Sequence, residues 1–186
     1  MIESTNDDTK IIFDADVLRH FFEVGYQHYL TKIFPDRIVI SKIVKSEVQN
    51  VDRFYLDIRN FIRRYNIEVI SIDDYPDNFK IQKEFAILTK KIDRGEAECL
   101  AIAKFDSKYV ASSNISQIED YCNKNNIKLY KTLDILCLGI INGVMTEHEC
   151  DNLIQLNRSR NNKLPNLTIA EYCATIQDSN PDNSSP

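Results

Sequence analysis

The chain of 186 residues has no long apolar run, no closely spaced cysteine pair and no histidine cluster, and each absence excludes a class of protein. No segment approaches the roughly 18 to 20 consecutive apolar residues that a membrane-spanning helix needs. The first ten residues are polar and acidic, whereas a signal peptide has a basic start followed by an apolar stretch. The sequence therefore predicts a cytoplasmic protein with no membrane partner.

The cysteines and histidines give no sign of a zinc site. The five cysteines stand singly with no Cys-x-x-Cys pair, and an odd number fits neither a disulfide framework nor a zinc site. We expect all five to be buried thiols: Cys99, Cys122, Cys137, Cys150 and Cys173. The three histidines, His20, His28 and His148, lack metal-ligand spacing, and a lone helical histidine is usually structural.

Basic residues are fewer than acidic ones, 23 against 28. The formal net charge is -5 at pH 7 and the pI is about 5.3. This balance argues against broad nucleic-acid binding driven by the field of the whole molecule. Local basic clusters remain, among them Lys90, Lys91 and Arg94, although a solvated helix face is the ordinary role of such a cluster.

Short apolar runs alternate with segments of helical periodicity along most of the chain. Strands are expected at 11–13, 37–40, 67–72, 108–111 and 127–130, and helices at 17–33, 42–48, 51–65, 79–89, 95–105, 116–124, 133–141 and 145–156. Parallel strands need long crossover connections, so this alternation predicts an α/β fold. We expect a three-layer α/β/α arrangement with a central parallel sheet of about four to five strands, followed by C-terminal helices.

Length and a hydrophobic content of 43% predict one well-formed core. We expect a polar N-terminal segment at 1–9, a core domain at 10–142, a helical extension at 143–175 and a disordered tail at 176–186. Thr146 and Glu149 form a capping box at the start of the extension's helix. The tail is rich in Ser, Asn, Asp and Pro, a composition typical of disorder.

Three acidic residues lie where α/β proteins commonly place their chemistry. Asp14 directly follows the first strand, and ligands of α/β sheets bind at the carboxyl ends of the strands. Glu47 lies on the helix after the second strand, and Glu96 lies in the first turn of the helix that Gly95 opens. Each also has a structural role open to it, as a helix cap, an exposed helical residue or a partner of the helix dipole. Glu98 is about 200° around the helix from Glu96, so only one of the two can face a shared site.

Four short segments combine polar or acidic residues with apolar neighbours: Phe13-Asp-Ala-Asp-Val-Leu18, Ser41-Lys-Ile-Val-Lys-Ser-Glu-Val48, Gly95-Glu-Ala-Glu-Cys-Leu-Ala-Ile-Ala103 and Val110-Ala-Ser-Ser-Asn114. Their order and spacing over about residues 10 to 140 resemble the PIN domain, the nuclease fold of VapC-type toxins. In that family three such acids converge on one or two Mg²⁺ or Mn²⁺ ions. The resemblance therefore implies that Asp14, Glu47 and Glu96 are the metal ligands.

The chain departs from the family pattern after the fourth strand, where PIN domains often carry Asp or Asn after a Thr or Ser and this chain has Ser112-Ser-Asn114. The resemblance implies that Asn114 is the fourth catalytic residue, ligating through its carbonyl oxygen or holding a metal-bound water, with weakened metal binding. Gln117 stands where a further acid is often found, so a second metal ion is not implied. The accessory residues expected are Ser112, as a hydrogen-bond partner of Asp14, and Asp16, Glu98, Gln117 and Asp134.

The resemblance implies a metal-dependent endoribonuclease that leaves a 5′-phosphate and a 3′-hydroxyl. Carboxylates can hold Mg²⁺ while the ion takes a phosphate oxygen and a nucleophilic water. The expected role is that of a toxin in a toxin–antitoxin, phage-defence or mobile-element system. The expected partners are RNA, contacted by Lys90, Lys91 and Arg94, a cognate antitoxin and a second copy of the chain.

Two alternatives stay open. A catalytically weak or dead PIN domain acting as a binding module is favoured by the missing fourth acid and the negative charge. A haloacid-dehalogenase-type phosphatase is the other, because Ile11-Ile-Phe-Asp-Ala-Asp16 resembles its nucleophile motif and would make Asp16 essential. Ser112 could stand for the Ser or Thr that this family carries at a second strand, but an acidic pair must then follow it. The strand-end pair of this chain, Asp73-Asp74, precedes Ser112 instead.

Overall fold

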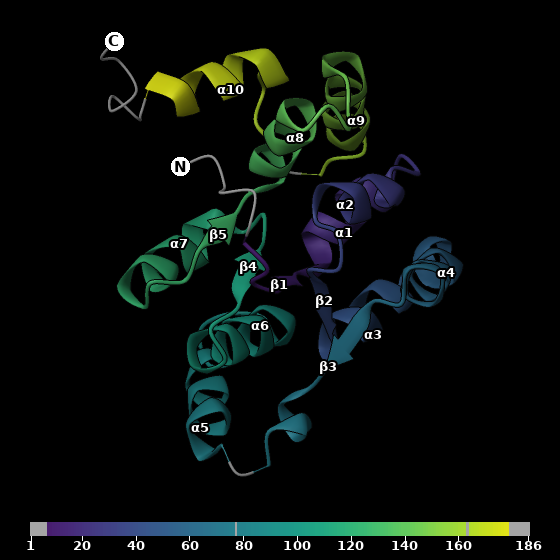
Figure 1. Ribbon diagram of the computed structural model, residues 1–186. Coiled ribbons are helices and arrows are strands. Elements are labelled where there is room, and N and C mark those ends of the chain that lie inside the picture. The colour runs from purple at the N-terminus through teal and green to yellow at the C-terminus, as the bar shows by residue number, and fades with distance from the viewer. Residues whose placement is uncertain (1–6, 77, 163, 179–186) are drawn as a thin grey trace.

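The structure is a computed structural model that describes residues 7–76, 78–162 and 164–178 (Figure 1). Its strands are β1 (Ile11–Phe13), β2 (Ile38–Ser41), β3 (Glu68–Ile70), β4 (Tyr109–Ala111) and β5 (Leu129–Tyr130). Its helices are α1 (Ala15–Phe22), α2 (Gln27–Ile33), α3 (Lys42–Gln49), α4 (Tyr55–Tyr65), α5 (Phe79–Leu88), α6 (Arg94–Phe105), α7 (Ile115–Lys124), α8 (Thr132–Ile141), α9 (Glu147–Ser159) and α10 (Ile169–Asp178), with 3₁₀ turns at Asp52–Phe54 and Ile72–Asp74. Among these described helices, none has the length and apolar character needed to cross a membrane.

The five strands form one parallel sheet in the order β3-β2-β1-β4-β5, which confirms the predicted fold class. β1 is the central strand, and its three residues are completely buried between β2 and β4. Because the strands are parallel, their carboxyl ends meet at one edge of the sheet. The Asp14 N–H accordingly donates to the Ala111 carbonyl oxygen at 2.8 Å, which joins the end of β1 to the end of β4.

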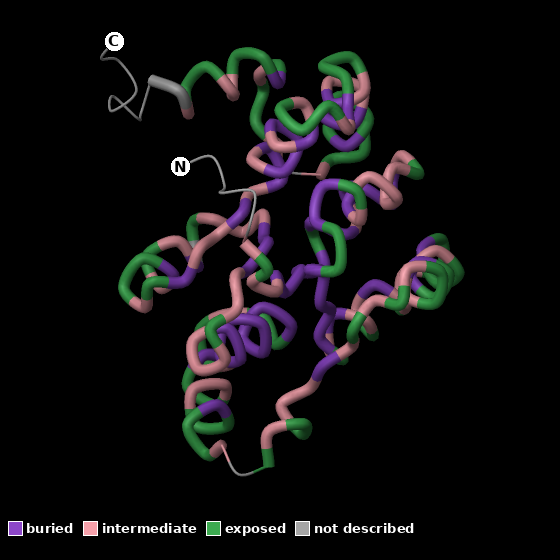
Figure 2. Tube along the Cα trace, viewed as in Figure 1, coloured by how far each residue is buried: buried purple, intermediate pink, exposed green. Residues whose placement is uncertain are grey.

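Helices cover both sides of this sheet. α6 packs against β1, β2 and β4, and α5 packs on α6 (Figure 1). In the view of Figure 1, α5 and α6 lie below the strands, whereas α8, α9 and α10 lie above them. Residues 95–103 of α6 are all buried, as the purple trace of Figure 2 shows. Two glutamates are therefore buried with the apolar residues of this helix.

The single helix expected at 17–33 is wrong, because the chain breaks there into α1 and α2. Gly25 has a φ of +72°, a left-handed conformation that glycine adopts without strain. The Tyr26 N–H then bonds back to the Phe21 carbonyl oxygen at 2.8 Å and closes the turn. Apolar spacing did not predict the break, because Phe21 and Leu30 on either side of it are both fully buried in the same core.

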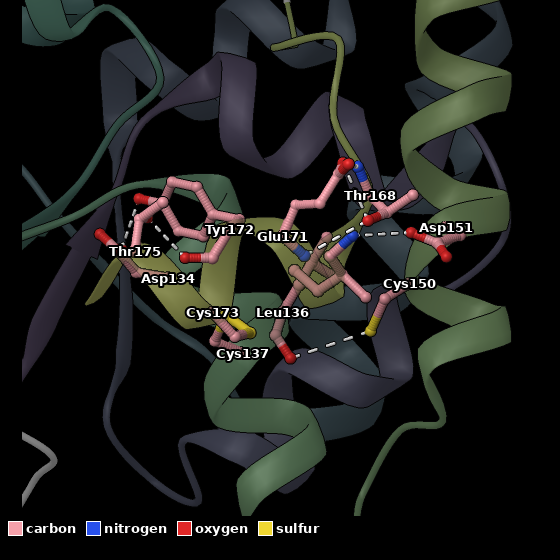
Figure 3. Close-up of a disulfide and its surroundings, with 11 residues drawn as sticks. Asp134, Leu136, Cys137, Cys150, Asp151, Thr168, Glu171, Tyr172, Cys173 and Thr175 are labelled. Carbon is pink, nitrogen blue, oxygen red and sulfur yellow. Dashed lines mark hydrogen bonds between the residues drawn. A yellow bond between two sulfur atoms is a disulfide. The ribbon is translucent and has the colours of Figure 1, made fainter. Parts of the chain in front are cut away.

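The expectation that all five cysteines are free thiols is wrong, because two of them are paired. Cys137 of α8 and Cys173 of α10 form a disulfide, shown in Figure 3, while the other three cysteines are buried thiols. The Tyr172 hydroxyl also donates to Asp134 Oδ1 at 2.8 Å, which ties α10 to the start of α8. The pairing joins residues 36 positions apart, so neither cysteine spacing nor the odd count could indicate it.

α10 falls largely within the helical extension expected at 143–175, although the apolar pattern did not predict its bounds. It runs to Asp178, so residues 176–178, expected to begin a disordered tail, are helical. The rest of that tail lies outside the described residues, as do residues 1–6. The capping box of Thr146 and Glu149 at the start of α9 is confirmed.

Reduction of the disulfide will destabilise the protein. Closing a loop of this length restricts the unfolded chain and is worth about 3 to 4 kcal/mol. Thiol titration of the denatured protein should give three free thiols before reduction and five after it. Reductant should lower the Tm of the wild type but leave the Tm of a Cys173→Ser variant unchanged. Five thiols in the unreduced protein would contradict the pairing.

Candidate active site

Asp14 lies directly after the central strand, and its carboxyl group is buried. Its Oδ1 accepts a hydrogen bond from the Ala15 N–H at 2.7 Å, and its Oδ2 accepts one from the Ser112 hydroxyl at 3.1 Å. Ser112 follows β4, so the parallel pairing of β1 with β4 brings the two side chains together. Asp14 is thus the N-cap residue of α1, and its expected hydrogen bond with Ser112 is confirmed.

Glu96 lies in the first turn of α6 and is only 6% exposed. Its Oε2 is buried and has no hydrogen-bond partner among the described residues. Burial raises the pKa of Glu96 to about 7, although a hydrogen bond with the Asn114 side chain opposes the shift. Asn114, which follows β4, therefore lies beside Glu96 at the same edge of the sheet as Asp14.

Glu47 reaches the start of α6 from α3. Its Oε1 accepts a hydrogen bond from the Gly95 N–H at 3.2 Å, one of the helix N-terminal groups that have no partner within the helix. Gly95 leaves the room for this contact, because a Cβ at that position would lie 2.6 Å from Glu47 Oε2. Burial raises the pKa of Glu47, and the hydrogen bond from Gly95 and the charge of Arg19 partly offset that shift.

The three carboxylates form one electrostatic cluster. Burial, followed by the negative charges of Glu96 and Asp16, raises the pKa of Asp14 to about 8. The charge of Glu47 likewise contributes, after burial and the charges of Asp93 and Asp16, to the raised pKa of Glu96. Asp16 is exposed at the edge of this cluster, where its charge acts on all three acids.

Glu98 faces away from the cluster and has a structural role. Its Oε2 accepts a hydrogen bond from the Ile43 N–H at 3.1 Å, and its Oε1 accepts one from the Ile72 N–H at 3.2 Å. The carboxylate therefore joins α6 to the start of α3 and to the turn after β3. Of the two glutamates in the first turns of α6, only Glu96 belongs to the acidic cluster.

Asp134 also stands apart, because both of its oxygens have other partners. Oδ2 accepts from the Lys131 N–H at 2.8 Å in the capping box of α8, and Oδ1 accepts from Tyr172. Gln117 lies in α7, and its side chain is outside the described residues.

A groove of about 670 Å³ adjoins the cluster at Glu47. It lies between α3, the turn after β3, α5 and α6. Its charged lining residues are the bases Lys42 and Arg94 and the acids Glu47, Asp73 and Glu98. Of the three predicted RNA contacts, Arg94 is part of this lining and its guanidinium carbon is 5.9 Å from the centre of the Phe85 ring. Lys90 and Lys91 are exposed in the turn that leads to α6 and do not line the groove.

The donor chemistry of the cluster fits a hard divalent cation. Carboxylate oxygens are the ligands that Mg²⁺ and Mn²⁺ prefer, and a cation would satisfy the unpaired Glu96 oxygen and the buried negative charge. Across the described ranges, however, no three His, Cys, Asp or Glu side chains are grouped closely enough to hold one ion. The arrangement thus fits a cation bound by one or two carboxylates with water in its other positions, as is usual for Mg²⁺.

Arg19 and His20 lie beside the acids, although the sequence motifs did not indicate them. Arg19 Nη1 donates to Asp16 Oδ1 at 3.1 Å and Nη2 donates to the Glu47 carbonyl oxygen at 3.2 Å, whereas Nε is buried with no partner among the described residues. Burial lowers the pKa of His20 to about 4, so its ring is neutral at pH 7. The i,i+3 spacing of Asp16 and Arg19 on a helix was the one signal that could have found Arg19.

A pocket of about 360 Å³ lies against these residues. Its lining includes Asp16, Arg19 and Asn114 together with Asn161 and Asn162, which follow α9 in the extension. No local pattern places residues 161 and 162 near residue 16, since the contact arises only when α9 packs on α1.

The chain belongs to the PIN-domain family, because the family model described as "DUF3368: PIN domain" matches residues 10–164. PIN domains are generally nucleases and typically use divalent metal ions, which places the chain with the hydrolases and removes the phosphatase alternative. No curated protein matches the chain significantly. A toxin–antitoxin complex from Klebsiella pneumoniae is similar at a TM-score of 0.45 and 18% identity, over 59% of this chain and 90% of that chain, a likeness that bears on neither fold nor function.

The metal-free protein should lose stability as the pH rises from about 4 to about 8. The pKa values of Asp14 and Glu96 are raised in the folded state, so their contribution is complete below the unfolded values and is lost as the folded groups ionise. Thermal melting in a chelator between about pH 5 and pH 9 measures the effect. Asp14→Asn cannot ionise at this position and should reduce the slope, whereas equal slopes for the two proteins would refute the account.

Proposed function

We propose that the chain is an endoribonuclease that depends on Mg²⁺ or Mn²⁺, with Asp14, Glu47 and Glu96 as the residues that hold the ion, one or two of them directly and the rest through its bound water, and with Asn114 as the fourth catalytic residue. The observation that carries this proposal is the buried cluster of carboxylates with raised pKa values, together with the unpaired Glu96 oxygen, at the carboxyl edge of a PIN-domain sheet. When bound, the ion would supply a polarised phosphate oxygen and a water of lowered pKa.

The residues of the chain hold the site in position. Ser112 and the Ala15 N–H fix the Asp14 carboxyl group, and the Gly95 N–H fixes the Glu47 carboxylate. The Asn114 side chain lies close enough to Glu96 to lower the pKa of that carboxyl group, against the larger effect of burial, while Glu96 Oε2 has no partner among the described residues. These fixed contacts leave little rearrangement to be done when substrate arrives, which lowers the free energy of reaching the transition state.

The lining of the groove beside Glu47 suits a single-stranded substrate. Lys42 and Arg94 partly offset the acids Glu47, Asp73 and Glu98 that line the same groove, and an ion bound at the cluster would add positive charge beside it. Phe85 adds an aromatic surface to the same groove, and stacking of bases on aromatic rings is a common means of holding single strands. We therefore propose Arg94 as an RNA contact within the groove, and Lys90 and Lys91, exposed in the turn before α6, as contacts outside it.

The proposal also includes the role of a toxin, a cognate antitoxin and a homodimer, which rest on the resemblance to VapC-type toxins. A cytoplasmic location is a further part of it and rests on the polar N-terminal residues of the sequence. Expression of the wild type in a bacterial host should arrest growth, whereas Asp14→Asn should not. Unimpaired growth with the wild-type protein present at high level would contradict the toxin role and favour the alternative of a PIN domain that acts as a binding module.

Replacing the central aspartate should abolish cleavage. Defined tRNA, mRNA and single-stranded DNA are incubated with Mn²⁺ and the wild type or Asp14→Asn. The variant should be slower by more than about 100-fold, since loss of a mere partner of a metal ligand already costs 10- to 100-fold. Equal rates would mean that the cleavage comes from a contaminant, and no cleavage of any substrate by the wild type would refute the proposed function.

Two further variants separate the site from the fold. Ser112→Ala removes the hydroxyl that holds Asp14 and should lower the rate by about 10- to 100-fold. Gly95→Ala improves helix propensity but displaces the Glu47 carboxylate, so the rate should fall while the Tm is maintained. Melting curves check both proteins, and a Gly95→Ala variant with full activity would exclude Glu47 from the site.

A further inference from the structure

We propose that the pocket formed by Arg19, Asn114, Asn161 and Asn162 binds one unpaired nucleobase of the RNA strand next to the cleaved phosphate. The proposal rests on the proposed function and adds a determinant of sequence specificity to it. The pocket borders the acidic cluster at Asp16, and its volume of about 360 Å³ lies within the range of small-molecule sites.

Buried contacts hold the side of the pocket that Asn161 and Asn162 form. Asn157 of α9 is fully buried, and its Nδ2 donates to the His20 carbonyl oxygen at 2.9 Å. The Asn162 side chain donates in turn to Asn157 Oδ1 at 2.7 Å. Arg160 adds an ion pair with the buried Glu23, which follows α1. These contacts fix residues 160–162 against α1 before any ligand binds.

The groups that remain free in the pocket suit a base better than a phosphate. The Asn161 side chain is exposed, lines the pocket and makes no hydrogen bond among the described residues. Amide groups present a donor and an acceptor together, the combination that pairs with the edge of a base. The neighbouring Asp16 carboxylate repels phosphate but accepts from amino groups. Single-stranded RNA is commonly recognised through such splayed bases.

Asn161 is the residue to test, because its side chain has no structural partner in the described part of the chain. Its φ of +62° is a conformation that glycine also adopts, so Asn161→Gly removes the amide without straining the turn. Asn166→Gly is the matched control, because residue 166 is exposed on the same extension and does not line the pocket.

The experiment measures cleavage of a single-stranded RNA of randomised sequence with Mn²⁺, with every cut site mapped by sequencing. Wild type and Asn166→Gly should prefer one base, or one pair of related bases, at a fixed position beside the cut. Asn161→Gly should lose that preference and cut the best sites about 10- to 100-fold more slowly. A wild type without a preference, or an Asn161→Gly variant that retains it, overturns the inference while the proposed function stands.

If the wild type cleaves no RNA, the proposed function fails. The proposal that the pocket binds a base is then tested by nucleotide binding instead. The four ribonucleoside 5′-monophosphates are then titrated into wild type and Asn161→Gly, and binding is followed by calorimetry and by NMR signals of the asparagine side-chain amides. At least one nucleotide should bind the wild type about 10-fold more tightly than the variant. Equal affinities, or no binding to either protein, overturn the inference.

Discussion

The burial of a carboxyl group at the end of the central strand is the constraint on which the site depends. Asp14 can be buried there because Ser112 and the Ala15 N–H satisfy its oxygens. The parallel pairing of β1 and β4 places Ser112, and the start of α1 directly after Asp14 places the Ala15 N–H. Burial also makes ionisation unfavourable, so neighbouring carboxylates raise one another's pKa values. The same packing that stabilises the sheet thus creates a place where a cation is favoured.

The sequence predicted most of the fold because local periodicity and the core agree in most segments. Each of the five strands is a short apolar run, and the helices of the core domain begin within a few residues of their predicted starts. The prediction failed where long-range packing decides the local conformation. Gly25 breaks a continuous apolar pattern, and α10 is held on α8 by the disulfide and by Tyr172, neither of which leaves a periodic signal.

Sequence reasoning could find the acids of the candidate site because each lies near the end of a strand or the start of a helix. It could predict only part of their geometry. Helical spacing correctly separated Glu96 from Glu98, but it could not say that Glu47 would hydrogen-bond Gly95 or that Asp134 would be engaged by Tyr172. Arg19, Asn161 and Asn162 come together from α1 and from the end of α9, and contacts between such distant segments follow from packing that no local motif encodes.

The anchoring of residues 157–162 on α1 couples the pocket to the C-terminal extension. Asn157 donates to the His20 carbonyl oxygen and Asn162 donates to Asn157, so the position of one side of the pocket depends on how α9 packs on α1. The hydrogen bonds of the acids, in contrast, come from residues at the ends of strands and the starts of helices. Substitutions that loosen α9 would therefore alter the shape of the pocket while the carboxylates keep their partners.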